Sequence, residues 1–296
     1  MHLSMKKNIL LSLLSVLICF SGQSQDSDFD KKFRLGLRVT PQPTWFTSNQ
    51  KNNVPNGLRL GFGFGLNVEY KFSEVAALLT GIGGDFESAR YNFRNDYANQ
   101  YVVACFKDSD GELIELKNGP ASNFMKNGVT ASVLKNRVIS TTHVTLPVIL
   151  KLSTKENNGL KWFGLLGLEI GVRVKTTATD NYYFDRKFTS DTTFTDDLNP
   201  KTANNLVIGK DASLIPLRLG INAGFGAEYN LSGSTSFFGS INFFGGLFNT
   251  ARKESNYLFS NWVDFTTTSP STNFTFKKVE QNFLLKAVRV NLGFMF

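Results

Sequence analysis

Residues 58–71 alternate strictly between apolar and polar side chains. Leucine, phenylalanine, valine and tyrosine occupy every even position, whereas arginine, glycine, asparagine, glutamate and lysine occupy the odd ones. A period of two separates these sets onto opposite faces of a β-strand, while a helix with 3.6 residues per turn would scatter them around its axis. The polar face is narrow and rich in glycine, and the apolar face is bulky. This combination is typical of a transmembrane barrel strand, with lipid outside and a cramped polar interior.

Seven further segments repeat this alternation with less regularity. In addition to residues 58–71, the predicted strands cover residues 33–46, 75–88, 137–152, 161–175, 216–230, 236–248 and 282–296. Three of the connections are short and polar, and they alternate with longer loops. An even number of strands joined in this way predicts an all-β fold, namely an eight-stranded antiparallel up-and-down transmembrane β-barrel with long extracellular loops. Both termini are then expected in the periplasm.

The predicted long loops cover residues 91–136, 176–213 and 249–280. The first is expected to contain a small hairpin with Asp110 and Gly111 at its turn. Loops on a rigid scaffold commonly carry function, and two of these loops contain aromatic clusters in polar surroundings. Exposed aromatic side chains are enriched at protein contacts, although these could equally pack on one another above the barrel. The aromatic clusters lie in NYYFDRKF at residues 181–188 and NYLFSNWVDF at residues 256–265.

The start of the chain has the pattern of an export signal. A basic beginning precedes an apolar run over residues 9–20, which is followed by small and polar residues. This pattern predicts a signal peptide over residues 1–24, cleaved after Gly22 or Ser24. The barrel domain is then expected to cover residues 25–296.

Cysteine and histidine are scarce. Cys19 raises the alternative of a lipoprotein, but Ile18 stands where a lipid-attachment signal normally carries a small residue. After ordinary cleavage Cys105 is the only cysteine and His143 the only histidine. These counts exclude an intramolecular disulfide and metal sites built from several thiolates or histidines.

The formal net charge of +8 comes from lysine and arginine spread through strands and loops. Because the basic residues form no cluster on one element and the chain is expected to be exported, nucleic acid is not a predicted partner. Positive charge suits an anionic outer leaflet, so outer-membrane lipid and lipopolysaccharide are the expected partners. Protein partners in a membrane complex are a further expectation.

The polar faces of the predicted strands place many charged side chains inside the barrel. These inward positions are Arg34, Arg38, Arg59, Glu69, Lys71, Asp85, Glu87, His143, Lys151, Glu169, Arg173, Arg218, Glu228 and Arg289. An eight-stranded interior is only wide enough to be filled by side chains, and an isolated buried charge is costly. We therefore predict a plug of ion pairs rather than a conducting pore. The predicted network comprises Arg34, Arg38, Glu69, Glu169, Arg218, Glu228 and Arg289.

Two strands carry related sequences, and these predict where the glutamates of the network lie along the barrel axis. GFGAEYNLS at residues 224–232 matches GLNVEYKFS at residues 65–73, and each segment lies just before a short turn. Glu69 and Glu228 are therefore expected at the same height near the periplasmic end, while Glu169 is expected halfway along the barrel. The expected neighbours are Arg34 and Lys151 for Glu69 and Glu228, and Arg38 and Arg289 for Glu169.

Aromatic residues gather at both ends of the predicted barrel, as lipid headgroups select at the two membrane interfaces. The short-turn end carries Phe33, Tyr70, Trp162, Tyr229, Phe294 and Phe296. The long-loop end carries Trp45, Phe46, Phe86, Tyr91 and Phe248. The terminal phenylalanine also resembles the signal by which the outer-membrane assembly machinery recognises its substrates.

The chain offers little catalytic chemistry. The only candidate base is His143, with Thr141, Thr142 or Thr145 as its nucleophile. We favour a structural role for this histidine, with its hydrogen bonds satisfied inside the lumen, over a catalytic role in a membrane-embedded enzyme. No motif that would orient a catalytic base accompanies it. The acidic residues around Gly111 lack the later ligands that a calcium loop needs, so a turn is the better interpretation. We predict no enzyme activity, no cofactor and no metal.

Several strand sequences resemble the PorT-like outer-membrane β-barrels of gliding and type IX secreting Gram-negative bacteria. The resemblance is carried by LRVTPQPTW, GFGLNVEYKFS, HVTLPVILK, GLLGLEIGV, GFGAEYNLS and VRVNLGFMF. It covers most strands and none of the long loops, and it implies an eight-stranded barrel. The founding member is needed for protein secretion. The expected function is a non-enzymatic scaffold or interaction role presented on extracellular loops, with a type IX secretion or outer-membrane assembly subunit, or a narrow solute channel, as alternatives.

Overall fold

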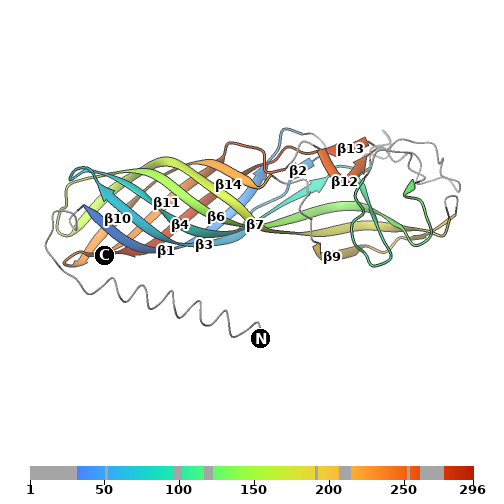
Figure 1. The fold of residues 1–296 in the computed structure, drawn as a ribbon, viewed down its shortest axis with the longest axis horizontal. Coiled ribbons are helices and arrows are strands. Elements are labelled where there is room, and N and C mark those ends of the chain that lie inside the picture. The colour runs from blue at the N-terminus through green and yellow to red at the C-terminus, as the bar shows by residue number, and fades with distance from the viewer. Residues whose placement is uncertain are drawn as a thin grey trace, which may run out of the picture.

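Eight long antiparallel strands close into a ring (Figure 1). The computed structural model describes residues 32–50, 53–95, 102–116, 123–190, 193–206, 215–251, 254–260 and 277–296. Each strand pairs with the next, and the last pairs with the first. The predicted eight-stranded antiparallel barrel is therefore confirmed. The ring comprises β1 (Phe33–Thr47), β3 (Arg59–Lys71), β4 (Ala76–Phe93), β6 (Thr130–Ser153), β7 (Leu160–Phe188), β10 (Leu217–Ser232), β11 (Thr235–Gly246) and β14 (Leu284–Met295).

The three short turns lie at one end of the barrel, which is also where the chain ends (Figure 1). The tightest of them joins β10 to β11 through Gly233, whose φ of 58° favours glycine. The backbone N–H of Phe296 donates to the carbonyl of Leu35 at 2.7 Å, and that of Lys71 donates to Lys32 at 2.8 Å. These bonds fix the last residue and the start of β1 at the short-turn end.

Alternation along the ring strands separates the two faces as the sequence predicts. Leu166 and Leu168 on β7 are 61% and 46% exposed, whereas Glu169 next to them is fully buried. Their neighbours across the sheet repeat the pattern because the antiparallel register keeps residues of one face in line. Apolar side chains therefore cover the outside of the ring, and charged side chains fill the inside.

Beyond the ring, β6 and β7 continue side by side in a sheet with five shorter strands, while a sixth short strand pairs with the end of β4 (Figure 1). We call this part the extension. It corrects the expectation that residues 91–136 and 176–213 are mainly loop, since β6 begins at Thr130 and β7 continues to Phe188. The outer face of these strands is polar, so their composition resembles that of a loop. The shorter strands are β2 (Asn53–Pro55), β5 (Ala104–Lys107), β8 (Phe194–Asp197), β9 (Lys201–Leu206), β12 (Glu254–Ser260) and β13 (Lys277–Glu280).

The predicted hairpin turn in the first long connection is present. The N–H of Asp108 donates to the carbonyl of Glu112 at 3.0 Å, and the N–H of Gly111 donates to the carbonyl of Asp108 at 3.1 Å. Gly111 has a φ of 83°, which a residue with a Cβ rarely adopts. The acidic side chains around it therefore serve a turn, with Asp108 accepting hydrogen bonds from the N–H groups of Asp110 and Glu112.

Two apolar clusters stabilise the extension. The first joins its base to the long-loop end of the ring and includes Phe46, Tyr91 and Phe283, whose rings lie 4.3 to 6.3 Å apart. The second, around Phe106 and Phe259, lies further out. Phe46 and Tyr91 are 3% and 0% exposed, so their expected place in the outer aromatic belt was wrong. Strand alternation points them inward, opposite to Trp45.

In the described part of the chain, no helix has both the length and the apolar character needed to cross a membrane.

Candidate functional site: the barrel interior

The barrel interior begins at the short-turn end with a ring of four charged side chains. Nζ of Lys151 lies 2.6 Å from Oε2 of Glu69 and 2.6 Å from Oε2 of Glu228. Arg34 completes the ring with its Nη1 at 2.5 Å from Glu228 and 3.5 Å from Glu69. The hydroxyl of Ser236 also donates to Glu228 at 2.7 Å. The related sequences in β3 and β10 thus place their glutamates at one height, where they share both cations.

An apolar layer lies next to this ring of charges, on the side away from the short-turn end. Phe163 on β7 opposes Gly226 on β10, and Phe238 on β11 opposes Gly293 on β14. A Cβ at either glycine would come within 2.7 Å of the facing ring, so only glycine leaves room for these aromatic side chains. Leucine, isoleucine and methionine side chains complete the layer. Sequence reasoning missed it, although the odd positions of β7 carry a readable signal at Phe163.

Five charged residues form a second network midway along the barrel. Arg218 donates to Asp85 at 2.9 Å, to Glu169 at 2.6 Å and to Glu87. Arg289 donates to Glu169 at 2.5 Å, to Asp85 at 3.1 Å and to Glu87 at 3.3 Å. Each guanidinium therefore bridges all three carboxylates. All five side chains are almost fully buried, so the charges compensate one another rather than being solvated.

The ring of Phe244 supports this network from one side. Its centroid lies 4.7 Å from the guanidinium carbon of Arg218 and 4.4 Å from that of Arg289. A Cβ at Gly220 would overlap the Phe244 ring, so this glycine makes room for a third inward aromatic side chain. An aromatic face attracts cations, which adds to the ion pairs. Phe244 was not among the residues predicted for the interior.

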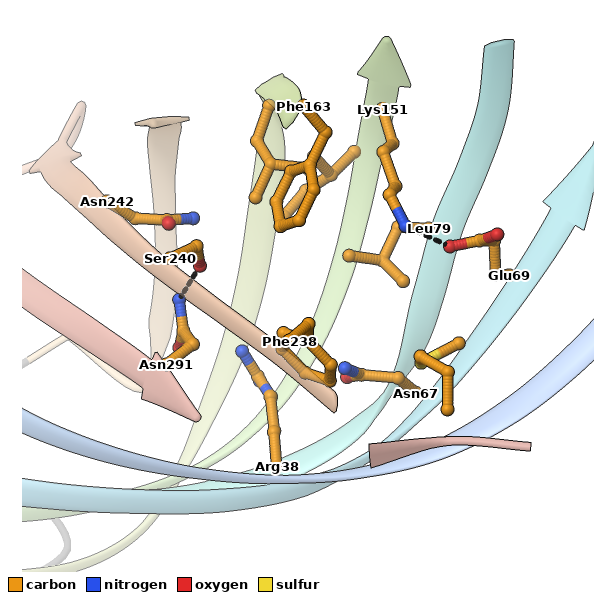
Figure 2. Close-up of a pocket in the computed structure, with 13 residues that line it drawn as sticks. Arg38, Asn67, Glu69, Leu79, Lys151, Phe163, Phe238, Ser240, Asn242 and Asn291 are labelled. Carbon is orange, nitrogen blue, oxygen red and sulfur yellow. Dashed lines mark hydrogen bonds and ion pairs between the residues drawn. The ribbon is translucent and has the colours of Figure 1, made fainter. Parts of the chain in front are cut away.

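Arg38 differs from the other predicted network members. It lies beside Gly65 and Gly83, and its Nε has no hydrogen-bond partner. Among the described residues no ion pair joins Arg38 to a carboxylate. Its charge nevertheless lies within electrostatic range of Glu169, as expected, and of Asp85. Figure 2 shows Arg38, Asn67 and Phe238 converging on a cavity of about 30 Å³. A cavity of this size holds only about one or two water molecules.

The charges in each layer are balanced. The lower ring has Arg34 and Lys151 against two glutamates. The middle layer has Arg218 and Arg289 in ion pairs with three carboxylates, and the nearby charge of Arg38 supplies the third positive charge. Balance matters because a buried charge without compensation is strongly destabilising. The apolar layer separates the two networks, and the cavity next to it that Arg38 lines has a volume of about 30 Å³.

His143 belongs to the middle layer. Its Nδ1 lies 3.3 Å from Oε2 of Glu87, and the side chain is 3% exposed. Within the described segments no hydrogen bond links it to Thr141, Thr142 or Thr145, and the hydroxyl of Thr145 has no partner. The geometry therefore supplies no base and nucleophile pair. Among the same residues no group of three or more histidine, cysteine or acidic side chains is arranged to hold a metal ion.

A separate buried ion pair lies in the base of the extension. Arg137 on β6 and Asp180 on β7 are direct register partners and form two hydrogen bonds of 2.6 Å each. Burial alone would lower the pKa of Arg137, but the Asp180 carboxylate raises it above its ordinary value. Burial, together with the charge of Asp180, raises the pKa of the nearby Cys105 thiol to about 12. Sequence reasoning missed this pair because a β-bulge near Val174 reverses the faces of β7 above it.

The predicted lower aromatic belt lies on the outer face of the ring. Trp162, Tyr229, Phe294 and Phe296 are 57%, 50%, 43% and 51% exposed. Tyr70 is half-buried against Phe33 and Phe72, at centroid distances of 4.7 and 5.2 Å. These side chains form a band around the short-turn end.

A closed eight-stranded ring with an apolar outer face and a charged interior defines an outer-membrane β-barrel. The family described as outer membrane protein beta-barrel domain matches residues 22–252. Because the match covers well over half of the chain, the protein belongs to this family and its place is the cell outer membrane.

Solved structures similar to this chain include Ail, the attachment invasion locus protein of Yersinia pestis. It is 10% identical, with 90% of this chain and 99% of that chain covered and a TM-score of 0.28. The N-terminal β-barrel domain of Pseudomonas aeruginosa OprF is 9% identical, with 88% and 97% covered and a TM-score of 0.26. Neisserial surface protein A is 7% identical, with 88% and 95% covered and a TM-score of 0.31. No curated protein matches the chain in sequence.

Proposed function

We propose that the protein is a non-enzymatic outer-membrane scaffold whose barrel anchors an interaction surface outside the membrane. The observation that carries this proposal is the interior, where charge-balanced networks and an apolar layer fill the ring. A filled barrel transmits nothing through its centre, so its useful surface lies elsewhere. The extension is that surface, because it is the part of the described chain that projects beyond the apolar belt (Figure 1).

The extension is suited to this role because it is a packed structure. Its sheet runs through β13, β12, β5, β6, β7 and β8, and two apolar clusters stabilise it. The Arg137–Asp180 pair adds a fixed polar contact at its base. A rigid platform loses little conformational entropy when it binds a partner, which favours specific recognition.

The orientation and the lipid contacts are part of the same proposal. Short turns face the periplasm in barrels of this class, so both ends of the chain are placed there and the extension outside the cell. The exposed belt that includes Trp162 and Tyr229 contacts the lipid interface at the short-turn end. Lipopolysaccharide of the outer leaflet surrounds the opposite end. Protease added to intact cells should cut the extension and leave a tag at the C-terminus intact.

A narrow solute channel is the competing function that the interior argues against. Reconstitution in a planar bilayer tests it directly. We expect no steady conductance from the wild-type chain. An ion crossing the barrel would have to pass both the charged network around Arg218 and Arg289 and the apolar layer that contains Phe163 and Phe238. Large, stable single-channel steps would contradict the sealed interior and favour the channel.

An accessory role in a type IX secretion or outer-membrane assembly complex is the more specific form of the scaffold proposal. The PorT-like strand sequences support it, whereas the extension has no counterpart in that resemblance. Purification in mild detergent distinguishes the two forms. A stoichiometric partner that is lost when the extension is replaced by short turns supports the complex subunit. A barrel that purifies alone under all mild conditions supports an independent scaffold.

A further inference from the structure

Two adjoining hollows open at the short-turn end of the barrel. The chain also terminates at this end (Figure 1). Their volumes are about 530 and 350 Å³, and they share lining residues that include Arg34, Lys71 and Lys161. We call them together the vestibule. Its floor is the four-residue ring of Arg34, Glu69, Lys151 and Glu228. The vestibule is therefore a polar cup closed on its inner side.

The lining of the vestibule carries more positive than negative charge. Six cationic and four anionic side chains line it, which leaves an excess of two positive charges. The cations are Lys32, Arg34, Lys71, Lys151, Lys155 and Lys161, and the anions are Glu69, Glu74, Glu156 and Glu228. Two of the anions are neutralised by the floor ring, and Glu156 pairs with Lys161 at 3.0 Å.

Three lining cations, Lys32, Lys71 and Lys155, form no ion pair within the described chain, against one such anion, Glu74. Of these cations, Lys32 and Lys71 are neighbours. The backbone N–H of Lys71 donates to the carbonyl of Lys32 at 2.8 Å, so the two residues are neighbours across the β1–β3 edge. Within the described chain neither forms an ion pair, although Lys71 is half-buried and points into the cup. The Lys71 ammonium is repelled by Arg34 and Lys161, and Glu69 and Glu228, which already belong to the floor ring, offset this only in part. An anion placed in the cup would remove the remaining repulsion.

We propose that the vestibule binds the carboxylates of an acidic peptide segment, with Lys32 and Lys71 as its principal cations. Flexible lysines suit this ligand because they act as movable point charges. One source is in the chain itself, since Asp26, Asp28 and Asp30 directly precede Lys32 in the sequence. The other source is an acidic segment of a second protein on the same side of the membrane. The proposal goes beyond the scaffold function, which concerns the opposite end of the molecule.

The test uses the full processed chain refolded in a neutral detergent. A fluorescein-labelled Asp-Ser-Asp-Phe-Asp peptide is titrated by fluorescence anisotropy, with Asn-Ser-Asn-Phe-Asn as the uncharged control. Four proteins are compared: wild type, K32Q/K71Q, D26N/D28N/D30N, and K187Q/K277Q. The last variant removes the same charge from exposed positions at the far end of the molecule. Thermal unfolding of each variant shows that it is folded.

Salt-sensitive binding of the acidic peptide is expected, with at least about fivefold weaker binding to K32Q/K71Q than to K187Q/K277Q. Tighter binding to D26N/D28N/D30N than to wild type identifies the chain's own aspartates as the occupant. Equal binding to these two proteins identifies an external segment. If neither protein binds the acidic peptide, or if K32Q/K71Q binds as well as K187Q/K277Q, the proposal is wrong. None of these outcomes depends on the extension, so they do not test the scaffold function.

Discussion

Glu69 and Glu228 lie on strands that do not pair with each other, yet their carboxylates are both 2.6 Å from Nζ of Lys151. The two glutamates occupy equivalent places in related sequences. Replacing Lys151 by methionine should leave two buried carboxylates with only Arg34 between them. We expect a loss of about 3 to 5 kcal/mol in the free energy of unfolding, as for other buried pairs broken on one side.

Urea unfolding in detergent micelles, followed by tryptophan fluorescence, measures this effect. Lys161→Met is the matched control, because Lys161 forms only a part-exposed pair with Glu156. The control should change the stability by less than about 1 kcal/mol. Equal effects of the two substitutions would show that the floor ring contributes no special stability.

The glycines facing the inner aromatic layer give a second prediction. Gly293→Val should overpack the interior, because its Cβ would overlap the carbonyl oxygen of Leu37 and lie 2.7 Å from the ring of Phe238. Overpacking of this kind costs about 1 to 3 kcal/mol. Gly239 points outward on the neighbouring strand, and its Cβ would meet only Leu292 at 3.5 Å. Gly239→Val should therefore be tolerated, and the same urea titration compares the two variants.

The outward direction of the apolar face can be tested at Leu168. Leu168→Arg places a charge within the apolar belt of β7 and should destabilise the barrel by about 2 to 4 kcal/mol in lipid vesicles. Ser140→Arg on the exposed outer face of β6 lies beyond that belt and should be nearly neutral. Folding yields and urea titrations in vesicles report both effects. A tolerated arginine at position 168 would contradict lipid contact at this face.

The Arg137–Asp180 pair gives a prediction about the extension alone. Asp180→Asn removes the charge that compensates the fully buried Arg137, so the base of the extension should loosen by about 3 to 5 kcal/mol. The ring should remain folded because its networks lie elsewhere. Limited proteolysis should therefore release fragments of the extension while a heat-modifiable barrel band persists. Asp197→Asn is the control, since Asp197 pairs with Lys201 in the extension and both of these side chains are 44% exposed.

Cys105 gives a pH-dependent prediction. Its pKa rises from 9.0 to about 12 on folding, so the folded state favours the neutral thiol. Below pH 9 the thiol is neutral in both states and has no effect on stability. Between about pH 9 and 12 the unfolded thiol loses its proton first, and the stability of the extension should fall. Cys105→Ala should reduce that pH dependence.

Alkylation measures the same property independently. At pH 8.5 iodoacetamide should modify the buried Cys105 thiol slowly in the folded chain and rapidly in urea, because the thiolate is the reactive form. In the Asp180→Asn variant, whose extension is expected to be loosened, the Cys105 thiol should react at an intermediate rate. Rapid modification of the folded wild-type chain would contradict a buried thiol with a raised pKa.

Strand alternation explains why so much of the ring could be predicted. The two faces of β3, β7 and β14 are properties of neighbouring residues, so a strand shows them before any partner is known. The same reasoning failed beyond the apolar belt. There, the outer faces of β6 and β7 are polar, and their threonines, asparagines and aspartates resemble a loop.

Phe46 and Tyr91 show how a local error arises. Both lie near the expected long-loop interface, but both are on the inward side of their strands and fill the first apolar cluster. Strict counting from Leu37 or Ile82 would have placed them inside. Whether an aromatic residue points inward or outward is therefore predicted better by its place in the strand alternation than by its distance along the barrel.

The sequence by itself determined the number of strands in the ring, the inward and outward faces of those strands and the need to pair the enclosed charges. Each of these follows from residues that are close together in the chain. Only the tertiary structure decided which of these charges meet. It showed that Glu169 bonds to Arg218 and Arg289, that Arg38 has no ion pair among the described residues, and that Phe163 packs on Gly226. Such contacts depend on the register and curvature of strands distant in sequence, and a shift of one residue would exchange every partner.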